Sequence, residues 1–325
     1  MNRIIAYVLI LSAFAACTAG EPCLKCEEAA KAQQVQSVSL SIGRGALPSE
    51  CVGSDSCQIY IFSGDGTLYN RFSGEGEDFE FFIGSGVYDI YAFANAPQLP
   101  LSPESAEELT GHCFSLVDNK PGKLVTAGCL ESVAITESSA LELEMEHLVS
   151  KVNYNVRVDI ENEILIRRGF KVLSVYMTNV VGECLPFSSE SDSPATVWYN
   201  LRNFESSEAD SLIFSQVDEF VANGDSLHGT STFYILPNSC SDPQDRSGLT
   251  PRKTRFVVKA LIGNQVYYYP VTIPRAEGNR EYIISLTVKN IGCLDPEDTD
   301  VTAQAAESSI AIQGWNAAQE IEYER

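Results

Sequence analysis

Basic side chains and the common catalytic motifs are scarce in this sequence of 325 residues. Lysine and arginine number 22 against 44 aspartates and glutamates, and the formal net charge is -22. No stretch forms a basic stripe, so nucleic acid is a poor partner and an anionic membrane surface would repel the body of the protein. The sequence also lacks a serine nucleophile elbow, a P-loop and an HExxH motif. We therefore do not expect an enzyme, a catalytic residue or a cofactor.

Metal-binding side chains are few and dispersed. The chain has three histidines, and its one CxxC pair, Cys23 and Cys26, has no second pair at zinc-ribbon spacing. Disulfides or buried thiols are favoured over a zinc site. No metal site is predicted. One acidic run is spaced like a solvated loop rather than a calcium site; it consists of Glu75, Glu77, Asp78 and Glu80.

Long apolar runs are also missing. Residues 4–14 form the apolar part of an N-terminal segment that begins with Arg3 and ends in Ala15-Ala16-Cys17. This run is too short to span a bilayer, and no later segment reaches the roughly 18 apolar residues that a span requires. Residues 1–16 are therefore predicted to be an export signal, and small residues before a cysteine resemble a bacterial lipobox, with Cys17 as the acylated residue. Ordinary cleavage after Ala15 is the alternative.

Export to an oxidising compartment would permit disulfides. Ten cysteines are present, and seven of them lie from Cys51 onward. Two pairs are close enough in sequence to bracket short loops, Cys51 with Cys57 and Cys113 with Cys129, although connectivity cannot be deduced from spacing. At most these local bridges are expected.

Short alternating runs recur along the whole chain, which is the pattern of half-buried strands. Two helices are expected, at 102–111, where Ser102, Pro103 and Glu104 resemble a capped start, and at 206–224, where apolar residues have helical spacing. Strands dominate both halves, so the prediction is an all-β protein of two sandwiches with one or two short helices. The strand runs include 58–62, 79–83, 87–93, 123–127, 140–145, 152–158, 170–176, 232–236, 256–262, 266–273, 282–288, 309–315 and 320–324.

The run at 37–45 combines two unusual properties. Val38, Leu40 and Ile42 alternate with serines, so one face is apolar and the other carries hydroxyls. A flexible, cationic turn of Gly43, Arg44 and Gly45 follows at once, and such a turn is accessible to proteases. Either this is an ordinary first strand and turn, or the strand is one that can be cut off behind its last residue.

Several segments, taken in order, resemble the fimbrillin family of Bacteroidales, the pilins of type V fimbriae. Each piece is weak, but together they cover most of the chain. They are the lipobox-like leader, the strand ending at Arg44, QIYIFSGDG at 58–66, VYDIYAFANAP at 87–97, HLVSKVNYNVRV at 147–158, FYILPN at 233–238, VYYYPVTI at 266–273, NREYIISLTVKNIG at 279–292 with DPE at 295–297, and IAIQGW at 310–315.

The resemblance implies two transthyretin-like β-sandwich domains, export as an outer-membrane lipoprotein precursor, and cleavage after Arg44 by an arginine-specific protease. Loss of the first strand would open a groove that a C-terminal segment of another subunit fills, either with Ile310 and Ile312 or with Ile321 and Tyr323. These side chains would enter the sockets of Val38, Leu40 and Ile42. The expected organisation is a signal peptide at 1–16, a leader with the removable strand at 17–44, an N-terminal sandwich at 45–147 and a C-terminal sandwich with the donor strand at 148–325.

Two functions of different classes follow. The first is a structural subunit of a cell-surface fimbrium that supports adhesion and polymerises with other fimbrial subunits by strand exchange. The second is a monomeric outer-membrane lipoprotein that binds a glycan or protein through its sandwich loops and keeps an acylated Cys17. Arg44 separates the two, because a cut there frees the body from its lipid. Stalk, tip and anchor roles, and any adhesion ligand, stay open.

Overall fold

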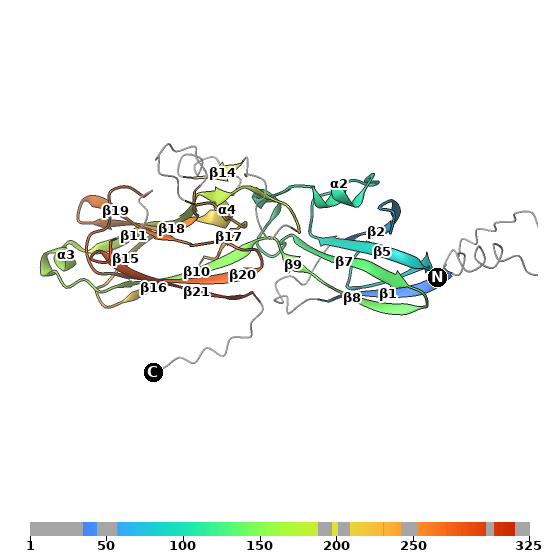
Figure 1. Ribbon diagram of the computed structural model, residues 1–325. Coiled ribbons are helices and arrows are strands. Elements are labelled where there is room, and N and C mark those ends of the chain that lie inside the picture. The colour runs from blue at the N-terminus through green and yellow to red at the C-terminus, as the bar shows by residue number, and fades with distance from the viewer. Residues whose placement is uncertain are drawn as a thin grey trace, which may run out of the picture.

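Two β-sandwich bodies lie end to end in the computed structural model (Figure 1), so the protein is elongated. The structure describes residues 35–43, 57–187, 197–200, 209–229, 231–241, 252–296 and 302–315. Strands dominate both bodies, which confirms the all-β prediction. None of the helices in these ranges is long and apolar enough to cross a membrane.

The N-terminal body stacks a three-stranded sheet, in the order β4-β1-β8, on a five-stranded sheet, in the order β3-β2-β5-β7-β9. Their facing side chains form one apolar core. The outer face of the larger sheet is covered by the segment that contains α2. The elements are β1 (Val35–Gly43), β2 (Cys57–Ser63), β3 (Leu68–Gly74), β4 (Asp78–Gly84), β5 (Gly86–Ala94), α2 (Ala106–Thr110), β6 (Phe114–Ser115), the 3-10 helix η2 (Leu116–Asp118), β7 (Thr126–Ile135), β8 (Ser139–Glu144) and β9 (Glu146–His147).

The C-terminal body packs the sheet β16-β10-β20-β21, with β17 also paired to β10, against the sheet β15-β11-β18-β19. Alternating residues of the central strands fill the interior. The elements are β10 (Ser150–Val158), α3 (Glu163–Arg168), β11 (Phe170–Thr178), β12 (Val180–Val181), β13 (Glu183–Cys184), β14 (Trp198–Tyr199), α4 (Asp210–Ile213), β15 (Phe214–Val221), β16 (Ser226–His228), β17 (Phe233–Ile235), β18 (Arg255–Ile262), β19 (Gln265–Thr272), β20 (Arg280–Val288) and β21 (Ala306–Gly314).

Three segments join the two bodies at a waist. The chain passes directly from β9, which pairs with β7, into β10 of the other body. Strand β13 returns to pair with β6. The loop before β20 also packs here, since the Asn279 N–H donates to the Val149 carbonyl at 3.2 Å. The buried cluster of the C-terminal body therefore continues into the outer layer of the N-terminal body, through Phe93 and Phe114.

The helix predicted at 206–224 is wrong over most of its length. Within the described residues 209–224, only the short α4 is helical, and residues 214–221 form strand β15. The physical reason is a bulge: between two paired positions β15 has one more residue than β11, and Asp218 there has φ 57. An extra residue breaks the two-residue period, and the resulting spacing of Val217 and Val221 imitates a helix.

Two further corrections concern α2 and the cysteines. The Ser105 side chain, rather than Ser102, caps α2, because it accepts from the Glu108 N–H at 3.3 Å. Neither expected local disulfide is formed, since Cys57, Cys113 and Cys129 all carry free thiols. Burial raises the pKa of the Cys57 thiol to about 12, so that group stays protonated at neutral pH.

Candidate functional site

Strand β1 occupies a central slot between β4 and β8. Val38 and Leu40 are 0% exposed and Ile42 is 7% exposed, while the serines between them face outward. The alternation read from the sequence is therefore correct in both period and face. Burial of three aliphatic side chains contributes roughly 5–9 kcal/mol relative to leaving them in water. Gln36 continues the buried face at 7% exposure.

Backbone pairing holds β1 on both sides. Seven of its residues pair with β4 in antiparallel register and six pair with β8 in parallel register. Side-chain contacts add to the ladder: the Ser41 hydroxyl donates to Asp78 Oδ1 at 2.9 Å, and the Gln36 amide donates to Ser85 Oγ at 3.5 Å. Without β1, the facing edges of β4 and β8 would both lose their partners.

The slot ends at the waist. The Met145 N–H donates to the Gly43 carbonyl at 3.3 Å, beside the point where β8 leads into β9. The other end of β1 lies at the far tip of the N-terminal body, away from the waist (Figure 1). Its first residue, Val35, pairs with Gly84, the last residue of β4. The predicted cleavage residue Arg44 and the predicted lipidation residue Cys17 lie outside the described residues.

Among the described residues, β21 is the outermost strand of its sheet and pairs only with β20, over nine residues. Ile310 packs against the core of the C-terminal body, whereas Ile312 is 53% exposed. The strand runs back to the waist, where Trp315 is buried. The centroid of its ring lies 4.3 Å from the ring centroid of His147 and 6.1 Å from that of Tyr234. Ile321 and Tyr323 lie outside the described residues.

The burial of His147 beside Trp315 predicts that the stability of the fold depends on pH. His147 is 2% exposed, and burial lowers its pKa from 6.5 to about 4. Between pH 6.5 and pH 4 the unfolded chain binds the extra proton and the folded chain does not, so folding is weakened as the pH falls. Lowering the pH from 7 to 4.5 should therefore reduce the free energy of unfolding by about 2–3 kcal/mol through this group.

Urea titrations that follow tryptophan fluorescence at pH 7 and pH 4.5 measure this loss. His147→Phe is the matched control, since it keeps an aromatic ring against Trp315 and cannot titrate. The variant should lose about 2–3 kcal/mol less than the wild type over the same interval. Equal losses in the two proteins would show that His147 does not contribute.

A cleft of about 540 Å³ lies at the waist. Its walls come from β7, from the end of β8 through β9, from residues 184–187 and from the loop before β20. The cleft lies next to the last residues of β1 and β21. Gly43 contacts Met145, which stands between the lining residues Glu144 and Glu146, and Gly314 pairs with the lining residue Arg280. Charges of both signs line it, namely Glu144, Glu146, Arg275, Glu277 and Arg280.

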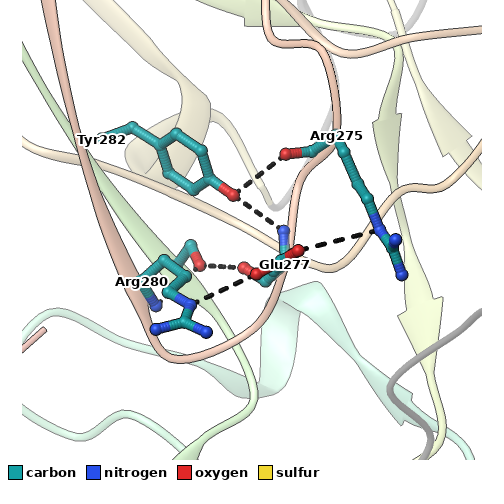
Figure 2. A network of polar contacts seen from close by, with 5 residues as sticks. Arg275, Glu277, Arg280 and Tyr282 are labelled. Atoms are coloured by element: carbon teal, nitrogen blue, oxygen red, sulfur yellow. Dashed lines mark hydrogen bonds and ion pairs between the residues drawn. The ribbon is translucent and has the colours of Figure 1, made fainter. Parts of the chain in front are cut away.

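The loop before β20 is fixed by a polar network (Figure 2). The Tyr282 hydroxyl donates to the Arg275 carbonyl at 3.0 Å and accepts from the Glu277 N–H at 2.9 Å. The Glu277 carboxylate lies 3.3 Å from Arg280 Nε and 3.8 Å from Arg275 Nε. The Ser150 hydroxyl donates to the Glu277 carbonyl and accepts from the Arg280 N–H. The loop is therefore tied to the first residue of β10.

Two cysteines, Cys129 and Cys184, line the cleft. Burial, with smaller contributions from Cys113 and Asp118, raises the pKa of the Cys184 thiol to about 12, so it is not a nucleophile at neutral pH. Across the ranges that the structure describes, no group of three or more histidine, cysteine, aspartate or glutamate side chains could hold a metal ion. The described residues of this region therefore offer a strand slot and a cleft lined by both charged and apolar side chains.

The comparisons identify the fold. No protein-family model matches the sequence, and no curated protein matches it in sequence. Among solved structures, a fimbrillin from Porphyromonas gingivalis aligns with a TM-score of 0.60 at 13% identity, over 86% of this chain and 97% of that one. The chain has the fimbrillin fold.

Two other structures share this fold. A candidate cell adhesion protein from Bacteroides eggerthii gives a TM-score of 0.63 at 14% identity, over 87% of this chain and 96% of that chain. A tip fimbrial protein from Porphyromonas gingivalis with a C-terminal truncation gives a TM-score of 0.55 at 11% identity, over 87% of this chain and 100% of that chain. By their descriptions, two of the three are fimbrial proteins and one is a candidate cell adhesion protein.

Several residues of the waist were not singled out from the sequence. His147 and Trp315 each lie in a motif that supported the resemblance, yet nothing in the spacing indicates that their rings meet. Asn279 has φ 52, a backbone conformation that asparagine tolerates better than most residues. An asparagine at the end of a turn was the one signal that could have marked this loop.

Proposed function

We propose that this chain is a fimbrial subunit that is exported as a lipoprotein, cleaved after Arg44 and joined to other subunits by strand exchange, in support of adhesion. The observation that carries the proposal is the position of β1, an N-terminal strand that is central in its sheet, ends at Gly43 and is followed at once by Arg44 and Gly45. An outer-membrane lipid on Cys17 would hold the precursor until the cut.

The donor in this proposal is the C-terminal tail, with Ile321 and Tyr323 as its apolar residues. Strand β21 carries Ile310 and Ile312, but it already pairs with β20 along its whole length. Its release would expose the edge of β20, next to the buried Tyr282. A donor beyond Trp315 leaves the pairing of β21 with β20 in place, and the proposal takes the tail as the donor for this reason.

The alternative is a monomeric surface lipoprotein that binds a glycan or protein ligand. It is supported by the cleft at the waist, which is lined by both charged and apolar side chains and is large enough for a small ligand. The position of β1 favours the polymerising subunit, because an anchored binding module has no use for a scissile turn behind its first strand.

The test of the proposal is the N-terminal residue of protein purified from cell-surface filaments. We expect it to be Gly45 in the wild type. Arg44→Lys keeps the charge of the turn but is not a substrate for an arginine-specific protease, so this variant should stay uncut and absent from filaments. Wild-type filaments whose subunits still begin at Cys17 would contradict the cleavage step.

A further inference from the structure

We propose that the outer edge of β21 docks onto the β21 edge of a second copy, with the two strands antiparallel, and that this contact joins subunits of two filaments side by side. The edge belongs to the single folded chain, so the docking itself needs neither cleavage nor strand exchange. Its role between filaments rests on the proposed function.

Strand β21 presents a long edge without the usual protection. Among the described residues it pairs with β20 alone, in a ladder of nine residues without a register shift. The backbone groups on its other side are therefore a template for a further strand. Natural edges are blocked by lysines, prolines, bulges or short length. The sequence of β21, AESSIAIQG, has no lysine or proline and a single charge, Glu307.

The other outer strands of this body carry such protection. In the ranges that the structure describes, β16 has three residues, and β15 contains the bulge at which Asp218 lies. Strand β19 contains Pro270, which has no N–H to donate to a further strand. The contrast singles out β21 as the edge that accepts a partner.

The side chains of β21 complement those of a second β21. Ile310 and Ile312 lie on the same face, since they pair with Ile284 and Tyr282, and Ile312 is 53% exposed. In the antiparallel register that sets Ala311 opposite the second copy's Ala311, each Ile312 lies opposite the other copy's Ile310. Cβ atoms of directly opposite residues are about 4.5–5.5 Å apart, so this register covers the exposed Ile312 of both copies.

The position of Glu307 favours the antiparallel direction. Glu307 lies near the start of β21, so a parallel pair in register would place two carboxylates side by side, which is unfavourable. In the antiparallel register each Glu307 lies opposite the other copy's Trp315. The two carboxylates are then separated by about 27 Å along the strands.

The charges of the two bodies favour the same direction. Residues 57–147 contain 15 acidic and 3 basic side chains, whereas residues 148–315 contain 21 acidic and 14 basic ones. Because β21 ends at the waist (Figure 1), an antiparallel pair places the N-terminal body of each copy beside the C-terminal body of the other. The two bodies that are poor in basic residues are thereby kept apart, and each lies beside the body that carries most of the basic residues.

The contact would repeat along a filament. One strand pair is a small interface and gives a weak dimer. Two filaments meet at many subunits, however, and linked weak contacts add to a strong one. Filaments that extend from facing cells run in opposite directions, so antiparallel docking would join one cell to another.

Docking is tested with the uncut precursor carrying Arg44→Lys, which prevents strand exchange, and Cys17→Ala, which removes the lipid. Sedimentation velocity over a range of concentrations should show a monomer–dimer equilibrium. Ile312→Lys should raise the dissociation constant at least tenfold, because it places a cation beside the other copy's Ile310. Phe220→Lys is the matched control and should leave the constant unchanged. Phe220 is 70% exposed on β15, which is followed by β16 at the opposite end of the β21 sheet.

The register is tested by cross-linking. Ala311→Cys sets two thiols opposite each other across the two-fold axis, and treatment with oxidised glutathione should link them. Ser309→Cys, exposed on the same face, is the control, since its two thiols would lie about 13 Å apart, too far for a disulfide. Non-reducing electrophoresis, compared with the parent protein treated alike, should show an added dimer band for Ala311→Cys alone.

Three results would overturn the docking: a precursor that stays monomeric at millimolar concentration, a dimer that Ile312→Lys leaves intact, or equal cross-linking of the two cysteine variants. All of these measurements use uncut protein. A failure of cleavage or strand exchange, which would count against the proposed function, therefore leaves their outcome unchanged.

Discussion

Deletion of residues 320–325 should abolish filament growth and leave a folded monomer. The described part of the C-terminal body is complete without this segment, since β21 ends at Gly314 and Trp315 packs against His147 and Tyr234. If the tail is the donor, its loss removes the only segment that enters the slot of the next copy. The measurement is treatment of purified precursor with an arginine-specific protease, followed by electrophoresis for detergent-resistant ladders.

Single substitutions sharpen this test. Ile321→Asp places an unpaired charge in an apolar position and should weaken each junction by several kcal/mol. Glu322→Asp, one residue away on the opposite face, is the matched control and should form ladders as the wild type does. Ladders formed by the truncated protein would rule out the tail and direct attention to Ile310 and Ile312 of β21.

Leu40→Asp should unfold the N-terminal body of the uncut precursor. Leu40 is 0% exposed and belongs to the apolar core between the two sheets. A carboxylate there has no partner among the aliphatic and aromatic side chains of that core, and its burial costs several kcal/mol. Urea denaturation followed by circular dichroism measures the loss, and Leu40→Ala, with an expected loss of about 2–5 kcal/mol, gives a value where the aspartate variant does not fold.

The matched control for Leu40→Asp is the same substitution at the neighbouring residue, Ser39. Ser39→Asp introduces the same side chain on the exposed face and should cost less than about 1 kcal/mol, mainly through repulsion from Glu80. A similar loss for Leu40→Ala and Ser39→Asp would mean that β1 contributes little to the core.

Local patterns predicted much of this fold because strands such as β1 and β10 bury alternate residues. The alternation of β1 predicted the correct face, and the runs at 256–262 and 266–273 correspond to strands β18 and β19, which pair with each other. Asp65 lies in the turn between β2 and β3, where its carboxylate accepts hydrogen bonds from Ser63 and Thr67, and these hydrogen bonds lower its pKa to about 2.

The misjudged elements share a physical cause: their periodicity is short or interrupted. Helix α3 was missed because only Leu165 of its six residues is buried, so no apolar period marks it. Its signal was at the ends, where the Asn162 side chain accepts from two backbone N–H groups and Gly169 has a positive φ. Caps can therefore identify a helix that is too short to show a stripe.

The candidate site was predictable only in part. The strand, the turn behind it and the acidic tail are each continuous in sequence, so their patterns could be read directly. The waist could not, because its cleft and the contact of His147 with Trp315 join residues from distant parts of the chain. Tertiary proximity of this kind leaves no periodic trace in a single sequence.

The placement of β1 between two partners also has a mechanical consequence. A donor strand in that position would be paired along both edges, as β1 is with β4 and β8. Tension along the strand axis would load both ladders in shear, so that many hydrogen bonds would have to break together. A strand paired on one edge and pulled sideways opens one bond at a time. A filament joined in this way should resist stretching far better than an end-to-end contact of the same area would.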